Sequence, residues 1–243
     1  MYHKIKNGAI FIADAHENDK RDKFYHFLTK IDNKEIVTSQ LFLMGDMFDL
    51  LVGKVEYTLD KNQKYIKLLN KIALHVEIIY FEGNHDFALS GTFENIIVIP
   101  IQKQPQQFVL EDDTLVYLSH GDKYGGFVHN LYTRLIRAST VLKVLNFIDK
   151  HSCNSISKTI ENDQHKKNIC KKIDNFEAII GEKLHKYKAN KKSYIAEGHY
   201  HQNYRFSKNG INYINFPSFA CNQSYFIVEC LQDEKFALRG CNV

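Results

Sequence analysis

Residue types that bind metal ions occur in five short blocks, and each block directly follows an apolar run typical of a strand. The blocks are Asp14-Ala15-His16, Gly45-Asp46-Met47-Phe48-Asp49, Gly83-Asn84-His85-Asp86, His120-Gly121-Asp122 and Gly198-His199-Tyr200-His201. In open α/β sheets, functional residues gather just beyond the carboxyl ends of the strands. Residues two apart at a strand end project to the same face, so the D-x-H and H-x-H pairs can each point at one position.

Carboxylates, one amide and imidazoles together suit Mn²⁺, Fe²⁺ or Zn²⁺, and suit Ca²⁺ less well. A carboxylate that bridges two such ions would hold them about 3.5–4 Å apart, the spacing used in two-metal phosphoryl chemistry. Any one pair alone is more often a surface or hydrogen-bonded pair than a set of ligands. Five of the twelve histidines lie inside these blocks, however, and this concentration favours a metal centre.

The elements that must position these blocks alternate between strands and helices over residues 8–122. Strands are predicted at residues 9–13, 41–44, 76–81, 96–99, 108–110 and 115–119, with amphipathic helices after the first two. Fully apolar strands between such helices indicate a mostly parallel sheet that is covered on both faces. Residues 125–188 have a helical pattern throughout. Strands then resume, with a hairpin predicted at Asn209-Gly210. We therefore predict a core of residues 1–124 and 193–243, and a helical cap inserted at residues 125–192.

The bulk composition is that of an ordinary globular protein, with 44% hydrophobic and 25% charged residues among 243. The five cysteines are odd in number and scattered, which argues against a disulfide framework or a cysteine zinc site and favours a reducing cytoplasm. We interpret all five as small residues without a role. No signal peptide is visible, and no apolar run reaches the roughly 20 residues that span a bilayer. We expect a cytoplasmic protein that at most contacts a membrane surface.

Positive charge is concentrated in the predicted cap. Residues 134–192 contain 14 Lys and Arg against 6 Asp and Glu, whereas the whole chain has a net charge of +4. A basic region beside a carboxylate-rich site suggests an anionic ligand or an anionic surface, although a solvated helix face would give the same pattern.

The order D-x-H, G-D-x-x-D, G-N-H-D, H-G-D and G-H-x-H resembles the signature of the calcineurin-like metallophosphoesterases, over residues 8–125 and 193–220. The resemblance implies a four-layer αββα sandwich of the α/β class, with two divalent ions, for which we expect Mn²⁺. The ligands it implies are Asp14, His16, Asp46 and His201 for one ion, and Asp46, Asn84, His120 and His199 for the other. It also implies that His85 contacts the phosphate or leaving group, that Asp49 orients His85, and that Asp86 is a structural hydrogen-bonding residue.

Within this family the chain looks most like the UDP-2,3-diacylglucosamine pyrophosphatases of lipid A biosynthesis, on the strength of residues 45–53 and 83–93. That resemblance implies cleavage of the pyrophosphate of UDP-2,3-diacylglucosamine to UMP and 2,3-diacylglucosamine 1-phosphate, with a helical cap that receives the acyl chains. His85 is a departure, because most members of this branch have Arg at that position.

For the cap we expect Arg134 and Arg137 to meet the diphosphate, and Leu142 and Leu145 to line an acyl groove. Ordinary helix packing is the alternative for these leucines. The expected partners are a lipid-linked nucleotide substrate and the cytoplasmic face of the inner membrane, with no nucleic acid and no obligate protein partner. The alternative function is a generic metal-dependent phosphodiesterase or phosphatase acting on a nucleotide or another soluble phosphoester. A non-catalytic scaffold is a poor reading, because all seven candidate ligands and His85 are present.

Overall fold

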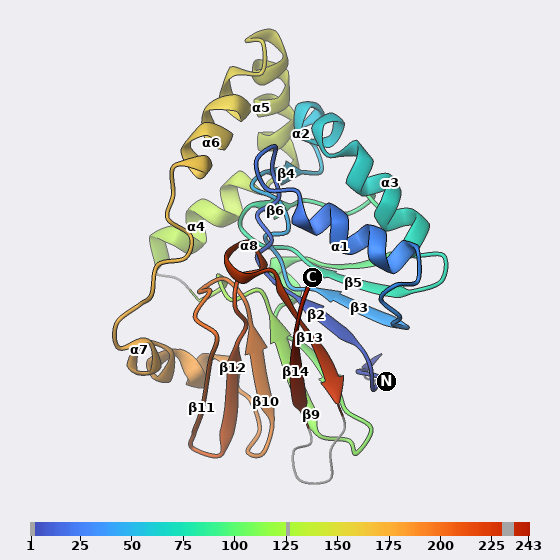
Figure 1. Ribbon diagram of the computed structural model, residues 1–243. Helices are drawn as coiled ribbons and strands as arrows, with labels where there is room; N and C mark the ends of the chain where they lie inside the picture. The colour runs from blue at the N-terminus through green and yellow to red at the C-terminus, as the bar shows by residue number, and fades with distance from the viewer. Residues whose placement is uncertain (1–2, 125–126, 230–235) are drawn as a thin grey trace.

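Two six-stranded sheets form the centre of the molecule (Figure 1). The computed structural model describes residues 3–124, 127–229 and 236–243. One sheet, the β2 sheet, has the spatial order β14 (Ala237–Asn242), β13 (Ser224–Glu229), β2 (Ile10–Ile12), β3 (Gln40–Leu43), β5 (Glu77–Phe81) and β7 (Ile96–Ile99). The other, the β9 sheet, has the order β1 (His3–Lys4), β8 (Gln106–Val109), β9 (Leu115–Ser119), β10 (Tyr194–Glu197), β12 (Ile211–Asn215) and β11 (Tyr204–Lys208). A short pair, β4 (Leu51–Val52) and β6 (Asp86–Phe87), lies outside both sheets.

The strands that lead to the five blocks are parallel and apolar on both faces. β2, β3, β5 and β7 pair in parallel, as do β9, β10 and β12. In β2, Ile10 and Ile12 point to a core under the outer helices, whereas Phe11 points to the core between the sheets. Phe11 stacks there on Phe42 of β3, with the ring centroids 4.3 Å apart. Continuous apolar runs arise because successive residues face different cores.

Helices cover the outer face of each sheet, which gives four layers. On the β2 sheet lie α1 (Lys23–Asp32) and α3 (Gln63–Ile72), preceded by α2 (Glu56–Lys61). On the β9 sheet lie α7 (Phe176–Lys183) and the 3₁₀ turn η2 (Leu184–Tyr187), whose apolar side chains pack against Tyr117, Ile195 and Tyr213. Short helices η1 (Ile101–Lys103) and α8 (Phe219–Asn222) complete the core. The predicted αββα sandwich is confirmed.

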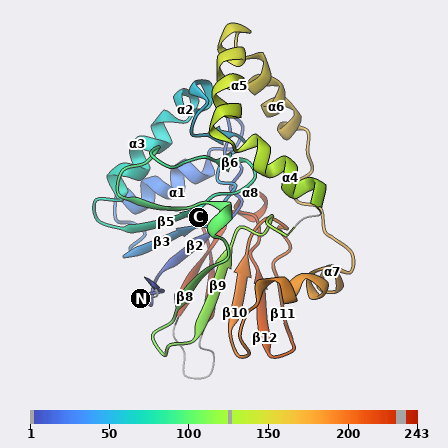
Figure 2. The same cartoon turned by 180° about the vertical axis from the view of Figure 1, so that it is seen from behind.

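Three further helices lie together beyond one end of the sheets (Figure 2). They are α4 (Phe127–Ile136), α5 (Ser139–His151) and α6 (Ser155–His165), which we call the cap. The prediction of helix throughout residues 125–188 is wrong at residues 166–175, which form neither helix nor strand. The division of the chain at residues 125 and 192 stays a prediction, because residue 125 lies outside the described residues and α7 packs against the β9 sheet.

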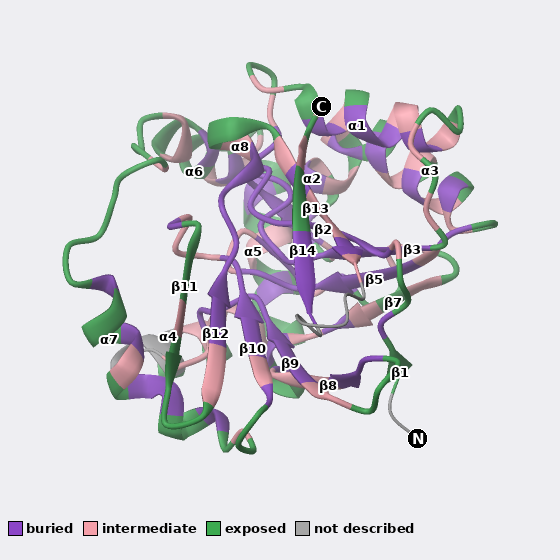
Figure 3. Cartoon of the chain, turned by 60° about the horizontal axis from the view of Figure 1, so that its bottom comes forward, coloured by how far each residue is buried: buried purple, intermediate pink, exposed green. Residues whose placement is uncertain are grey.

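The predicted hairpin is present between β11 and β12, which pair in antiparallel fashion. Asn209 and Gly210 have φ values of 55° and 79°, as the tight two-residue turns of hairpins require. β11 is the edge strand of its sheet and is largely exposed (Figure 3). Its exposed Arg205 and Lys208 place charge on that edge, which discourages pairing with another chain.

The prediction that no cysteine has a structural role is wrong for two of them. Cys170 and Cys221 form a disulfide across 51 residues of sequence. Cys153 and Cys241 are free, and Cys230 lies outside the described residues. The bond removes the cysteine argument for a reducing cytoplasm. None of the described helices has the length and apolar character needed to span a bilayer.

Candidate metal centre

The five blocks meet where β2, β3, β5, β9 and β10 end. Two sets of three side chains each place one ligand atom within 4.8 Å of the others: Asp14, His16 and His201 in the first cluster, and Asp46, His120 and His199 in the second cluster. Asn84 joins the second cluster, because its Oδ1 lies 3.2 Å from Nε2 of His120. The structure thus brings all seven predicted ligands together, and their role as ligands stays a proposal.

The backbone at these residues is unusual. Five of the clustered residues have φ between 45° and 64°, in the left-handed region: Asp14, His16, Asp46, His199 and His201. Residues other than glycine adopt this region in only a few per cent of cases. Such conformations cost of order 1–3 kcal/mol each and concentrate at functional sites. Tertiary packing therefore holds the clustered side chains in place at the expense of local backbone energy.

Two motif glycines allow the carboxylates to approach the backbone. A Cβ atom on Gly83 would lie 2.2 Å from Oδ1 of Asp46, and one on Gly198 would lie 2.5 Å from Oδ2 of Asp14. Neither carboxylate could keep its position beside a larger residue. The first positions of G-N-H-D and G-H-x-H are therefore glycine for a steric reason.

Two histidine rings are oriented by backbone carbonyls. Nδ1 of His120 lies 3.0 Å from the carbonyl oxygen of Met44, and Nδ1 of His201 lies 2.5 Å from that of Ile169. In each ring Nε2 then faces a carboxylate of its own cluster, at 3.3 Å from Asp46 and 3.2 Å from Asp14. Metal-binding histidines typically have this arrangement, with one nitrogen anchored and the other free for the ion.

The ring of His16 is anchored by a carboxylate instead. Its Nδ1 lies 3.3 Å from Oδ1 of Asp49, and its Nε2 is buried with no hydrogen-bond partner in the described part of the chain. A buried nitrogen normally has a partner, so an orphaned one within a cluster of ligands fits a missing cation. The donor set and this atom together fit a divalent metal ion.

The side chain and the backbone of Asp49 contact different residues. Its carboxylate accepts hydrogen bonds from Arg21 at 2.8 and 2.9 Å and from Asn18 at 2.6 Å, and lies beside His16. Its backbone carbonyl, not its carboxylate, lies 3.0 Å from Nδ1 of His85. Asp49 thus contacts His85 through its backbone, and its role in orienting that ring stays a prediction. Arg21, absent from the motifs, draws the side chain toward His16.

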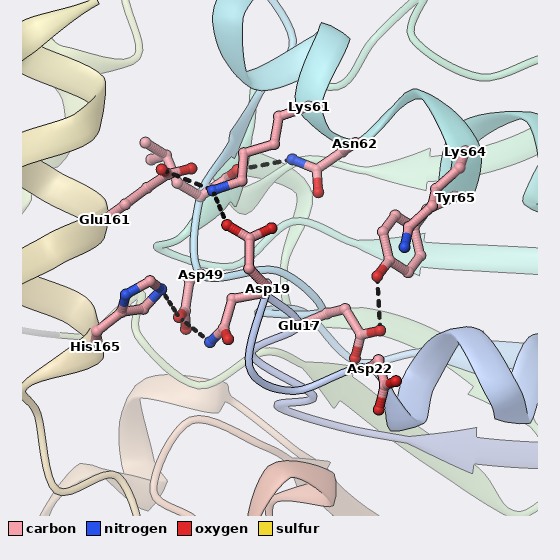
Figure 4. A pocket seen from close by; sticks show the side chains of 12 residues that line it. Glu17, Asp19, Asp22, Asp49, Lys61, Asn62, Lys64, Tyr65, Glu161 and His165 are labelled. Atoms are coloured by element: carbon pink, nitrogen blue, oxygen red, sulfur yellow. Dashed lines mark hydrogen bonds and ion pairs between the residues drawn. The ribbon is translucent and has the colours of Figure 1, made fainter.

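A cap residue that the sequence did not indicate also contacts Asp49. Nε2 of His165, at the end of α6, lies 3.6 Å from Oδ2 of Asp49 (Figure 4). In the same pocket Lys61 bridges Asp19 and Glu161, at 3.1 and 2.9 Å. Only tertiary structure brings these groups together, because α6 is more than 100 residues from Asp49 in sequence.

At Asp46 and His199 the electrostatics favour the forms that bind metal. Burial raises the pKa of Asp46, but His120 and His85 outweigh this and hold it well below its ordinary value. Desolvation and the nearby His120 lower the pKa of His199 to about 3. An ionised carboxylate and a neutral imidazole are the forms that ligate metal ions. At His120 and His201, burial lowers the pKa, but the carboxylates of Asp46 and Asp14 more than offset this and raise it.

Asp86 has the structural role that was predicted for it. Its carboxylate accepts hydrogen bonds from the backbone amides of Asp46, Met47 and Gly83, at 2.6–2.9 Å, and from the hydroxyl of Tyr80 at 2.6 Å. Every oxygen is occupied by these donors. Asp86 therefore holds the loop of Asp46 against the loop of Asn84.

A pocket of about 570 Å³ extends from the clusters to the cap. Its metal end is formed by Asn84, His85 and His199. On the cap side it is lined by the apolar residues Ile136, Leu142, Leu145, Ile156 and Ile160 and by the polar residues Asp149, Ser157, Asp163 and Gln164. Leu142 and Leu145 thus lie where an acyl groove was predicted. Arg134 does not: it is exposed and lines a separate depression with Asp122, Lys123 and Tyr124.

Arg137 lies at the metal end of the same pocket and is almost fully buried. One nitrogen, Nη2, donates to the carbonyl of Gly83 at 2.6 Å and lies 3.5 Å from Asp122. The guanidinium lies above the ring of Phe87, 5.2 Å from its centroid. The other nitrogen, Nη1, is buried and has no hydrogen-bond partner among the described residues. Arg137 thus offers an unused donor beside Asn84 and His85.

Comparisons with known proteins agree with the site. No protein-family model matches the chain. A UDP-2,3-diacylglucosamine hydrolase of Haemophilus ducreyi is 26% identical over 198 residues, which are 79% of this chain and 83% of that protein. The same enzyme of Blochmanniella floridana is 29% identical over 120 residues, 47% of each chain. Its namesake in Psychromonas ingrahamii is 32% identical over 88 residues, 35% of this chain and 36% of that protein.

Among solved structures, the phosphoesterase Yfce from E. coli covers 95% of this chain and 97% of its own, at 15% identity and a TM-score of 0.43. The αββα sandwich and the five motifs at its strand ends are similar to those of the metallophosphoesterase class. Within that class, the curated relatives confirm the resemblance to UDP-2,3-diacylglucosamine hydrolases that the motifs predicted.

Replacing Asp46 with alanine should remove bound divalent metal. Its carboxylate faces His120 and interacts electrostatically with His16 of the other cluster, so its loss weakens both. We expect at least about a tenfold fall in affinity, in line with the effect of removing even an outer partner of a ligand. Metal content per chain after dialysis against a metal buffer measures this, with the exposed Asp60→Ala as control. Metal content equal to wild type would contradict the assignment.

Proposed function

We propose that the protein is a dinuclear-metal hydrolase that cleaves the pyrophosphate of UDP-2,3-diacylglucosamine to UMP and 2,3-diacylglucosamine 1-phosphate. The observation that carries this proposal is the continuous pocket from Asn84, His85 and His199 to the apolar side chains of the cap. A phosphodiesterase for soluble substrates would have no need of an apolar extension next to its reacting centre. The names of the curated relatives support the same substrate.

The proposed metals are two Mn²⁺ ions bridged by Asp46. The first would be held by Asp14, His16, Asp46 and His201, and the second by Asp46, Asn84, His120 and His199. Support for the bridge comes from Asp46, whose charge interacts with histidines of both clusters. When bound, such a pair supplies Lewis acidity for the phosphoryl oxygens and a water of lowered pKa.

His85 is the proposed group that moves a proton or stabilises charge on the phosphate. Its Nδ1 faces the carbonyl of Asp49, which accepts a hydrogen bond from the protonated nitrogen. Nε2 is then left for substrate, at the mouth between the clusters and the pocket, 4.0 Å from Asp46. Burial lowers the pKa of His85 and so favours the neutral ring, whose Nε2 is then able to accept a proton.

Arg137 and Lys167 are the proposed contacts for the diphosphate. Arg137 has a buried, unused N–H at the metal end of the pocket, and a guanidinium pairs well with phosphate oxygens. Lys167 lines the same pocket from the end of the cap and interacts electrostatically with His85. Together they offset the negative charge of the substrate where it would otherwise face Asp46.

The outer surface of the cap is proposed to contact the membrane that holds the lipid substrate. Large apolar side chains are exposed there on α4 and α5: Leu131, Leu135, Val144, Phe147 and Ile148, each at least 47% accessible. The surrounding region carries the basic excess found in the sequence. Exposed apolar residues beside positive charge suit an anionic lipid surface. The cytoplasmic location stays a prediction.

Release of UMP is the direct test. The wild-type protein with Mn²⁺ should release UMP from a UDP-diacylglucosamine and hydrolyse soluble phosphodiesters far more slowly. Leu145→Asn should then lower kcat/KM for the diacylated substrate much more than for a soluble phosphodiester, because each buried methylene contributes about 0.8 kcal/mol. The control is Leu74→Asn, which changes an exposed residue of the sandwich. Equal losses on the two substrates would favour the generic phosphodiesterase.

His85→Ala should lower kcat by about 10²–10⁴-fold, the usual contribution of a general acid or base. Metal content should stay at the wild-type level, because the hydrogen bond from His85 to Asp46 comes from the backbone amide, which the variant keeps. Steady-state kinetics together with metal analysis separate the two effects. Loss of bound metal in this variant would instead make His85 a ligand.

Phe147→Asp should reduce binding of the whole protein to vesicles that contain anionic phospholipid. Phe147 is 63% exposed on α5, so the charge disturbs the surface and not the fold. Co-sedimentation with vesicles measures the bound fraction, and Leu74→Asp, at 74% exposure on the core, serves as the matched control. If both variants bind as the wild type does, the cap surface does not face the membrane.

A further inference from the structure

The segment that returns from the cap to the core passes directly over the first cluster. This return segment, residues 166–175, runs from α6 to α7 (Figure 1). The carbonyl of Ile169 within it lies 2.5 Å from Nδ1 of His201. The ring of a proposed ligand is therefore oriented by a stretch of chain that belongs to neither sheet.

Hydrogen bonds with Gln202 also hold the return segment. Nine of its ten residues are exposed, and Ile169 itself is half-buried. Farther along, the side chain of Gln202 accepts from the amide of Ile173 at 2.9 Å and donates to the carbonyl of Lys171 at 3.2 Å. The ammonium of Lys172 donates to the carbonyl of Gln202 at 2.9 Å. Next to Ile169 is Cys170, which is joined to Cys221. The covalent tie thus lies one residue from the carbonyl that orients His201.

The other end of the disulfide is fixed to the same cluster. Cys221 lies in α8, and the residues around it hold the backbone of Asp14. The hydroxyl of Ser218 donates to the carbonyl of Asp14 at 2.7 Å, and the amide of Ala220 donates to it at 3.2 Å. The disulfide therefore joins two stretches of chain that each contact a different residue of the first cluster.

We propose that the Cys170–Cys221 disulfide positions His201 and makes metal affinity at the first cluster depend on thiol redox state. Both cysteines are exposed, so a reductant reaches the bond. A dithiol would supply two electrons and two protons: the S–S bond breaks, two thiols form, and the reductant becomes a disulfide. The return segment would then lose its tie beside Ile169, and the carbonyl would hold the His201 ring less firmly. This inference rests on the proposed metal centre but not on the proposed substrate.

Binding of Mn²⁺ to the whole metal-free protein, measured without substrate by competition with a chelating dye, tests the proposal. Outer partners of ligating histidines typically contribute 10–100-fold to metal affinity. We expect Cys170→Ser, Cys221→Ser and the double variant to show the same loss, about tenfold at one site. Cys153→Ser and Cys241→Ser, at the free cysteines, should bind as wild type does. Wild-type affinity in all variants overturns the proposal, as does a lower melting temperature with unchanged affinity.

A second measurement does not depend on whether the serine variants fold. The folded wild-type protein is alkylated first, which caps cysteines outside the disulfide, and its affinity gives the baseline. It is then reduced with a phosphine and alkylated again, and the affinity should fall by the same factor. An unchanged value overturns the inference. Because no substrate is present, failure to hydrolyse the lipid nucleotide leaves this result intact.

Discussion

Two buried carboxylates set the constraint on which the rest of the site depends. Asp14 and Asp46 are at most 2% exposed, and taking an unpaired carboxylate out of water costs several kcal/mol. Burial raises the pKa of Asp14, but the nearby His201 more than offsets this, so the pKa is lowered overall. The charge of the nearby Asp46 raises the pKa of Asp14 and so opposes His201. Positive charge on imidazoles or divalent cations offsets the negative charge of two carboxylates buried close together. The strained backbones, the motif glycines and the anchored rings all serve to hold this charge balance in one geometry.

Polar contacts join the cap to the core. Lys61 pairs with Glu161, Lys150 pairs with Glu56 at 2.8 Å, and His165 approaches Asp49. The Lys150–Glu56 pair is exposed, and an exposed pair contributes about 0–1 kcal/mol. Among the described side chains, Leu142 and Ile136 make apolar contact with the β4 and β6 region. The pocket thus has one wall from the sandwich and one from the cap.

Apolar periodicity was sufficient for the strands, and the family resemblance supplied the sandwich and the set of ligands, whose role stays a proposal. Continuous apolar runs define β2 and β3, and each block follows its strand within a few residues. The direction of the Asp49 carboxylate could not be predicted, because Arg21 determines it and no motif includes Arg21. The Cys170–Cys221 bond and the contact of His165 join segments distant in sequence, so no spacing indicates them. Arg134 and Arg137 are one helical turn apart, and only the placement of α4 decides which of them faces the pocket.

β9 and β10 are parallel neighbours in their sheet, yet residues 120–193 separate them in the chain. Pairing of these two strands therefore closes one long loop, and the free energy of closure grows only with the logarithm of loop length. Doubling the loop would cost about 0.6 kcal/mol. A core of this design can accept insertions of very different size at the same place, so its substrate range can change through the inserted helices while the strand ends keep their chemistry.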